Sequence, residues 1–205
     1  MLEGPVMDAS QLLQAATVID LHNDTIVMHL WCGGLSVGDS TAERQCLRAG
    51  VMASLGRCGS PLPLSAPQLD LQRMRLAGMD VGFFAVDVSP AHGQRLAYAL
   101  DAFGALLCDV AAGDEPACWV HSGEDIDRAR ASRRPGIVMA IEHAGATEGS
   151  LNVLRALYAL GVRSIGLTHN VSSVAADGVA EARDGVGLTR FGVELVREMN
   201  HLGML

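Results

Sequence analysis

A histidine and an aspartate two residues apart follow a short apolar segment near the start of the chain. In VIDLHNDT, the pattern of residues 18–21 predicts a buried strand, and His22 and Asp24 come directly after it. Residues i and i+2 of an extended chain share a face, so both side chains point the same way. An imidazole and a carboxylate on one face form half of a site for zinc or a similar divalent ion. The alternative is a polar strand end at which Asp24 caps a turn.

A carboxylate and another histidine follow two later apolar segments. Glu142 comes directly after IVMAI, residues 137–141, and His169 follows residues 162–167 in the sequence LTHN. A glutamate at such a position is a usual bridging ligand in two-metal sites, and a histidine there can bind substrate or polarise a carbonyl group. The alternatives are a salt bridge from Glu142 to an arginine and a hydrogen-bonded histidine at the rim. Together, the three segment ends favour a metal site.

Other chemistries find little support in the residue types. The chain contains no lysine, so all 15 basic residues are arginine. This excludes Schiff-base chemistry, a P-loop lysine and a metal bridge made by a modified lysine. The segment 185–187 lacks the GxGxxG pattern, so no dinucleotide site is expected. His29, His92 and His121 have no partner at ligand spacing, and His201, late in a predicted helix, is expected to interact with the C-terminus of that helix.

The composition bounds the class of protein. The chain has 205 residues, 49% of them hydrophobic, which suits one domain with a sizeable core and excludes a disordered chain. A formal net charge of −8 argues against nucleic acid or an anionic membrane surface as partners. No apolar run reaches the roughly 18 residues of a membrane span, and residues 1–14 do not resemble a signal peptide. Five cysteines without a CxxC pair indicate reduced thiols and a cytoplasmic location.

Predicted strands and helices alternate along the chain. Apolar runs predict strands at 18–21, 81–88, 137–141 and 162–167, with a short extra strand at 118–120. Helices are expected near 11–16, at 69–77, after Ser122, at 151–160 and at 191–202. One more helix is expected to bury a face that carries Leu96, Leu100, Phe103, Leu107 and Val110. Residues 33–67, rich in Gly, Ser and Pro, predict a long excursion between elements.

This alternation is typical of βαβ units around a parallel sheet. Four such units, followed by Met204 and Leu205 where a fifth strand would begin, look like the first half of a (β/α)₈ TIM barrel. We therefore expect an α/β fold of the TIM-barrel type that holds about four βα units, an incomplete barrel. The alternative is a small open α/β sheet. In a barrel, the polar groups at the carboxyl ends of the strands face the active site.

Five successive blocks of the sequence resemble one family. They are VIDLHNDT, QLDLQRMRLAGMDVGFF, IVMAIEHAGA, LRALYALGVRSIGLTHN and GLTRFGVELVREMNHLGML. In this order they are similar to blocks of the membrane (renal) dipeptidase family of zinc peptidases, over residues 18–205. The resemblance implies a (β/α)₈ barrel with a binuclear zinc centre that hydrolyses dipeptides. It further implies that His22 and Asp24 bind the first zinc, that Glu142 bridges the two ions, and that His169 contacts substrate or transition state.

Two departures from the family pattern stand out. His143 occupies a position where the family usually has glycine, so an imidazole beside Glu142 either crowds the site or offers an additional ligand. The family's two further histidine ligands, and the arginine and aspartate that handle substrate and proton transfer, lie on later strands and do not occur among these residues. The resemblance therefore implies at most one well-liganded zinc site here.

Two hypotheses about function follow. In the first, residues 1–205 are the N-terminal half of a metallodipeptidase barrel, with a dipeptide as substrate and impaired activity in this chain alone. In the second, the chain is a non-catalytic half-barrel, a fragment or a subunit, that docks with a separate C-terminal half. A half-barrel leaves strand edges open, so we also expect self-association as a homo-oligomer in the absence of that half.

Overall fold

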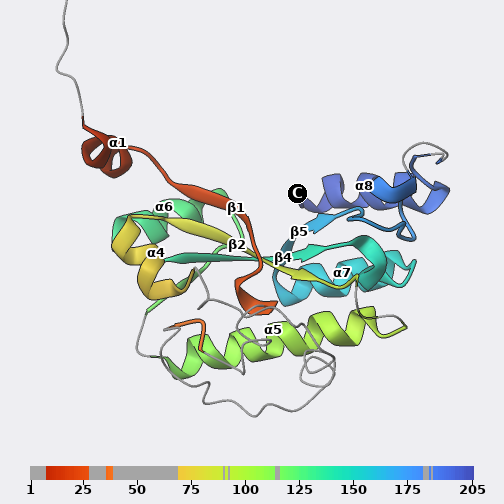
Figure 1. The fold of residues 1–205 in the computed structure, drawn as a ribbon, viewed down its shortest axis with the longest axis horizontal. Coiled ribbons are helices and arrows are strands. Elements are labelled where there is room, and N and C mark those ends of the chain that lie inside the picture. The colour runs from red at the N-terminus through yellow and green to blue at the C-terminus, as the bar shows by residue number, and fades with distance from the viewer. Residues whose placement is uncertain are drawn as a thin grey trace, which may run out of the picture.

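The computed structural model describes residues 8–27, 36–38, 69–89, 91, 93–113, 116–181, 185 and 187–205 (Figure 1). Apart from residues 36–38, the predicted excursion at 33–67 lies outside the described residues. The same holds for Cys32, Cys46, Cys58, His29 and His92.

Five parallel strands form one sheet. Their bounds are β1 Ile19–Asn23, β2 Val81–Asp87, β3 Cys118–Trp119, β4 Gly136–Glu142 and β5 Val162–Gly166. β2 pairs with β1 on one edge and with β4 on the other, and β5 continues the sheet beyond β4. The two-residue β3 pairs with the first residues of β4, next to the stretch that β5 occupies. The four longer strands thus follow one another in chain order, as the sequence predicts for successive βα units.

Helices separate these strands. Their bounds are α1 Ala9–Ala15, α4 Leu71–Ala77, α5 Arg95–Ala112, α6 Gly123–Ser132, α7 Leu151–Leu160 and α8 Arg190–Leu202, with 3₁₀ turns η1 Ala144–Thr147 and η2 Val179–Glu181. Glycines in the left-handed conformation end α4, α7 and α8, at Gly78, Gly161 and Gly203. Ser122 caps α6 in a capping box with Asp125, as expected. Within the described residues, no helix is long and apolar enough to cross a membrane.

The core lies between one face of the sheet and the helices. Alternate residues of the central strands, such as Phe84 in β2 and Ile141 in β4, pack in one buried cluster with residues of α4, α5, α7 and α8. Residues of the other face, among them Phe83 and Val138, form a smaller cluster that Ile126 of α6 partly covers. In Figure 1, α5 and α7 run along the lower side of the sheet.

The buried face of α5 differs from the predicted one. Leu100 and Leu107, expected in the core, are 44% and 37% exposed. Phe103 is buried as predicted, and Leu96 and Val110 are partly buried against the core. The buried residues of the helix are Tyr98, Ala99, Ala102, Phe103, Leu106 and Asp109. Large apolar residues occur on several sides of α5 itself, so their periodicity alone cannot show which side faces the sheet. Small alanines allow close approach there, and the stripe with the aromatic rings is the one buried.

The last residues of the chain lie beside β5. The backbone N–H of Leu205 donates to the carbonyl of Arg163, and the N–H of Ile165 donates to the carbonyl of Leu205, both at 2.9 Å. One residue that bonds to positions i and i+2 of its neighbour is the hydrogen-bond pattern of parallel strands. Leu205 therefore lies where the next strand is expected.

Candidate metal centre

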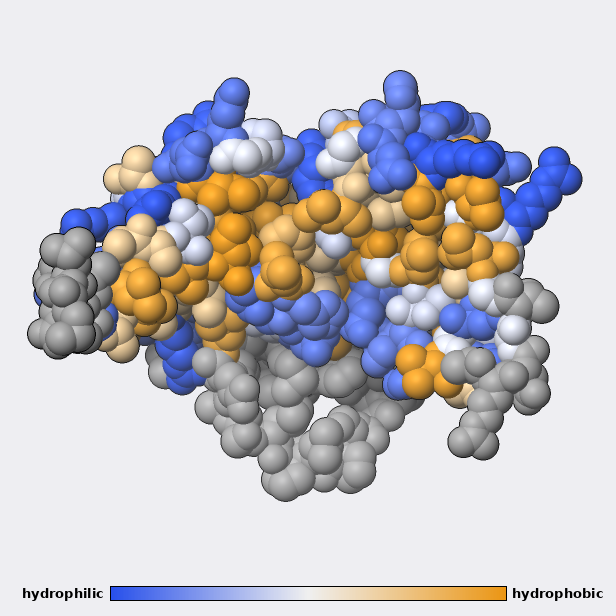
Figure 2. All heavy atoms as spheres, turned by 90° about the horizontal axis from the view of Figure 1, so that it is seen from above, coloured by the Kyte–Doolittle hydropathy of each residue, from blue (hydrophilic) through white to orange (hydrophobic). Residues whose placement is uncertain are grey.

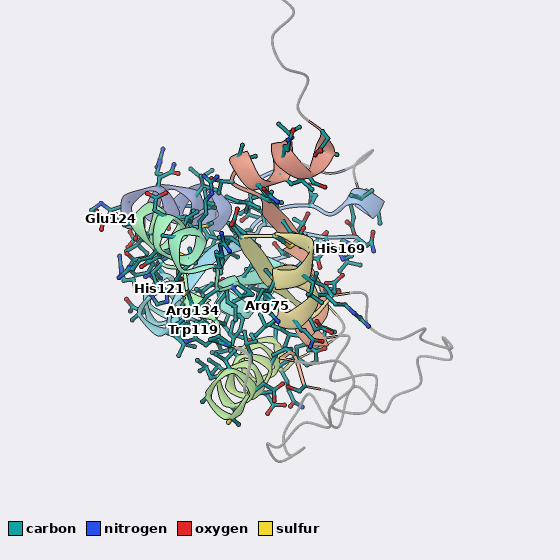
Figure 3. All side chains as sticks on the ribbon, turned by 90° about the vertical axis from the view of Figure 1, so that its left-hand side faces the viewer. Arg75, Trp119, His121, Glu124, Arg134 and His169 are labelled. Atoms are coloured by element: carbon teal, nitrogen blue, oxygen red, sulfur yellow. The ribbon has the colours of Figure 1, made fainter. Side chains whose placement is uncertain are left out.

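The four predicted site residues meet at one edge of the sheet. His22 lies near the end of β1 and Asp24 follows this strand, Glu142 is the last residue of β4, and His169 comes shortly after β5. Because the strands are parallel, their carboxyl ends share this edge. In Figure 3, His169 lies on the opposite side of the molecule from Trp119 and His121. His121 is therefore remote from the candidate site.

One group of ligand atoms joins β1 to β4. The Nε2 atom of His22 lies 3.6 Å from Oε2 of Glu142 and 3.7 Å from Oδ1 of Asp24. All three ligand atoms lie within 4.8 Å of one another. Zinc binds nitrogen and oxygen at roughly 2.0–2.2 Å, which places the ligands of one ion about 3–4 Å apart. The spacing and the donor types therefore fit one divalent ion.

The neighbouring turn is capped by a residue other than Asp24. The backbone N–H of Thr25 donates to Oδ1 of Asn23 at 3.3 Å, and the Asn23 amide donates to Asp20 at 2.9 Å. Asn23 and Asp20 thus support the end of β1. The Asp24 carboxylate lies beside the His22 imidazole. This position favours a role as a metal ligand over the alternative that Asp24 caps a turn.

A second group of ligand atoms shares the same glutamate. The Nδ1 atom of His169 lies 3.4 Å from Oε1 of Glu142 and 3.9 Å from Oδ2 of Asp87. These three atoms also lie within 4.8 Å of one another. Asp87 is the last residue of β2 and is aligned with Glu142 in the register of the sheet. Sequence reasoning did not identify Asp87, although a carboxylate after VGFFAV is the same strand-end signal that identified Glu142.

Ser89 fixes the orientation of Asp87. The backbone N–H of Ser89 donates to Oδ1 of Asp87 at 2.8 Å, and the Ser89 hydroxyl donates to Oδ2 at 2.9 Å. Each carboxylate oxygen has a further lone pair, so both remain able to bind a cation. Hydrogen bonds of this kind orient a ligand before the ion arrives.

The electrostatics of Glu142 reflect its crowded position. Burial raises the pKa of Glu142, and the Asp87 carboxylate raises it further, while His169 and His22 act in the opposite direction. The imidazoles of His22 and His169 lie 3.6 Å and 3.4 Å from its carboxylate oxygens, and within the described residues no arginine pairs with it. The predicted alternative, an arginine salt bridge, is thus wrong for the described part of the chain. Half-buried carboxylates that lie side by side destabilise one another when ionised, and a bound cation would offset this repulsion.

His143 directs both ring nitrogens to the backbone. Its side chain is fully buried. Nδ1 accepts a hydrogen bond from the Gly145 N–H at 3.0 Å, so the ring proton is on Nε2, which donates to the Ser172 carbonyl at 3.3 Å. Burial and the Arg95 guanidinium lower the pKa of His143, so the ring favours this neutral form. The imidazole is therefore engaged with the backbone and is not an additional ligand.

The backbone at His143 has the conformation of a glycine. Its φ of 125° lies in the region that L-residues with a Cβ rarely adopt. The resemblance implies glycine at this position, which agrees with the conformation. The ring is accommodated because Gly145 has no side chain, since a Cβ there would lie 2.7 Å from Nδ1 of His143.

The segment that carries His169 is fixed by backbone contacts. The carbonyls of His169 and Asn170 accept hydrogen bonds from Val179 at 3.2 Å and Ala180 at 3.0 Å. Gly178 approaches so closely that a Cβ there would collide with the backbone of Val171. The position of the imidazole is thus set by the fold of the segment after β5.

Comparison with known proteins places these features in a family. The family model for membrane dipeptidase, peptidase family M19, matches residues 6–205. An uncharacterized dipeptidase of Schizosaccharomyces pombe is 40% identical over 72 residues, which are 34% of this chain and 17% of the yeast protein.

Two solved structures share the fold. The crystal structure of dipeptidase AC, a metallopeptidase of family M19, is 26% identical with a TM-score of 0.69, and the match covers 92% of this chain and 55% of that one. A Rhodobacter sphaeroides metallopeptidase bound to a phosphinate mimic of L-Ala-D-Ala is 24% identical with a TM-score of 0.69, covering 92% and 57%. These neighbours have the TIM-barrel type of fold, and this chain spans about half the length of each. The chain belongs to the membrane dipeptidase family, peptidase family M19.

Proposed function

We propose that residues 1–205 form half of a metallodipeptidase barrel, that His22, Asp24 and Glu142 provide a zinc position, and that this position serves the hydrolysis of dipeptides. The observation that carries the proposal is the convergence of His22, Asp24 and Glu142 from the ends of two strands. Membership of the family supports the choice of reaction and of metal.

The atoms that face one another suggest a role for each residue. Nε2 of His22, Oδ1 of Asp24 and Oε2 of Glu142 would hold the ion. A zinc ion bound there supplies Lewis-acid polarisation of the scissile carbonyl and lowers the pKa of a water molecule. His169, which lies beyond Glu142 and is 40% exposed, would contact the substrate and donate a hydrogen bond to the charge that develops on the carbonyl oxygen.

The test is hydrolysis by the zinc-loaded chain. L-Ala-D-Ala and L-Ala-L-Ala are incubated with the wild type, with Glu142→Gln and with Glu194→Gln, which changes an exposed glutamate of α8. We expect slow release of amino acids that stops when zinc is chelated and falls on the order of 10²-fold or more in Glu142→Gln. Glu194→Gln should match the wild type. Equal rates in the wild type and Glu142→Gln would overturn the proposed enzyme activity.

A specific observation favours a second candidate, a half-barrel that docks with a separate C-terminal half. Leu21 of β1 and Leu205, beside β5, are each 70% exposed. Seen from the side where β1 and the C-terminus lie, the surface shows a broad band of apolar residues between two hydrophilic margins (Figure 2). Exposed apolar surface of this kind marks an interface or a tendency to associate.

Light scattering coupled to size exclusion tests this candidate. We expect the 205-residue chain to self-associate, and Leu21→Gln to shift it toward the monomer. Leu76→Gln, which changes an equally exposed leucine of α4, is the matched control. A compact monomer that binds no apolar dye would contradict the candidate.

A further inference from the structure

We infer that this chain contains a second cation position, on the Oε1 side of Glu142, with Asp87 and His169 as its other ligands. The inference deepens the proposed function, and it rests on that function only for the first ion. It differs from the resemblance, which implies histidines on later strands as the second ion's ligands. It also exceeds the single well-liganded site that the sequence predicts.

The first step concerns the two carboxylate oxygens of Glu142, which face different groups. Oε2 faces the His22 imidazole at 3.6 Å, and Oε1 faces the His169 imidazole at 3.4 Å. A carboxylate whose two oxygens face ligands from different strands has the arrangement of a bridging ligand. The two groups of ligand atoms share Glu142 and otherwise come from different residues.

The second step is the state of the His169 ring. Its Nδ1 atom is buried and, among the described residues, has no hydrogen-bond partner. Glu142 at 3.4 Å and Asp87 at 3.9 Å are too distant or too poorly aligned for a hydrogen bond. A buried polar atom without a hydrogen-bond partner needs a physical explanation, and a bound ion is one of the usual ones. A divalent cation between Nδ1 and the two carboxylates would satisfy all three groups.

The third step is charge. Asp87 and Glu142 lie opposite one another at the ends of β2 and β4, so their carboxylates repel when both are ionised. Ser89 holds the Asp87 carboxylate in place through two hydrogen bonds, so Asp87 cannot easily turn away. A cation at this point converts the repulsion into two ligand bonds.

This role is compatible with substrate contact by His169. The imidazole is 40% exposed although Nδ1 is buried, so the accessible part of the ring lies away from the two carboxylates. Ligation through Nδ1 fixes the proton on Nε2. The ring can then bind a cation on one side and donate a hydrogen bond on the other.

Metal stoichiometry tests the inference without an activity assay. Metal-free chain is loaded with Zn²⁺, passed through a desalting column and analysed for zinc, and Co²⁺ binding is followed by absorption. We expect two ions in the wild type, one in Asp87→Asn, one in His22→Ala and none in the double variant. The affinity for the lost ion should fall on the order of 10²-fold or more. Glu194→Gln should retain both ions.

The outcomes separate this inference from the proposed function. Two ions in Asp87→Asn, or a single ion in the wild type, would overturn the second position. The first position would still stand in that case, provided that His22→Ala loses an ion. Loss of an ion in Asp87→Asn but not in His22→Ala would overturn the first position and support the second. Should Asp87→Asn fail to fold, Ser89→Ala replaces it, because this variant retains Asp87 and should weaken only the second ion.

Discussion

The two sides of the candidate site rest on very different parts of the sheet. Asp87 and Glu142 end β2 and β4, which pair in register over their whole length and are buried at every position except the last. His22 belongs to β1, the first strand in the sheet order, and Asp24 directly follows it. The register between β1 and β2 is irregular before Asn23, and the side chains of His22 and Asp24 are each 50% exposed.

This difference indicates which contacts hold the ligand side chains in place before an ion binds. On the central side, packing and the Ser89 hydrogen bonds fix the ligands before an ion binds. On the β1 side, local hydrogen bonds of Asp20 and Asn23 support the backbone, and the ligand side chains are half exposed to solvent. The β1 ligands must therefore lose more side-chain freedom when an ion binds.

The largest expected effect comes from removing the group that the two sides share. Glu142→Gln should lower zinc affinity at both positions on the order of 10²-fold or more, because each position loses its only carboxylate from β4. Calorimetric titration of metal-free chain with Zn²⁺ measures this. Retention of one tightly bound ion would show that the two positions do not share Glu142.

A smaller effect is expected from loosening the central side alone. Ser89→Ala removes the hydroxyl that donates to Oδ2 of Asp87, while the backbone bond to Oδ1 remains. We expect a loss of roughly 10- to 100-fold in affinity for the ion beside Asp87, as is typical of outer hydrogen bonds to metal ligands. Ser122→Ala, which removes a helix-capping hydroxyl of α6, is the control and should leave zinc binding unchanged. Equal zinc affinity in Ser89→Ala and the wild type would indicate that packing alone orients Asp87.

The same contrast shows what could be predicted from sequence. The strands lie within one or two residues of their predicted bounds, because strands of a parallel sheet are short apolar runs bounded by glycine, proline and charge. The predicted burial is wrong for β1, which is exposed or half-buried at every residue because, among the described residues, it has a neighbouring strand on one side only. Asp87 was missed because the predicted strand ran on to Val88 and placed the carboxylate inside it. One residue of error at a strand end is unimportant for the fold, but here it hid a site residue. The positive φ of His143 could not be predicted from its side chain, since only the family glycine hinted at it.

Ion release offers a direct comparison of the two sides. When a chelator is added in excess to the loaded wild type, we expect two phases of zinc loss, the faster about tenfold quicker, because the exposed ligands of β1 detach more readily. His22→Ala should lack the fast phase and Asp87→Asn the slow one. The reverse assignment would mean that burial on the central side does not slow the exchange of the ion.

The smallest expected effect concerns His143, which links the end of β4 to the segment after His169. Burial, and secondarily Arg95, lower its pKa below the usual 6.5 in the folded chain. In the unfolded chain the ring takes up a proton at about its usual pKa, so just below pH 6.5 the unfolded state binds more protons than the folded state. His143 therefore does not lower the free energy of unfolding above pH 6.5. It lowers this free energy as the pH drops from 6.5 toward the pKa of His143 in the folded chain.

Thermal unfolding of the chelated chain on both sides of pH 6.5 measures this contribution. We expect the Tm of the wild type to fall by a few degrees relative to His143→Gly as the pH drops, since 1 kcal/mol shifts the Tm of a domain this size by roughly 2–4 °C. His143→Gly also relieves the backbone strain at a φ of 125°, so the change with pH carries the argument and the absolute Tm does not. The raised pKa of Glu142 acts in the opposite direction, stabilising the fold as the pH falls, and it is present in both proteins, so the comparison removes it. Parallel Tm curves for the two proteins would mean that His143 is not kept neutral by its surroundings.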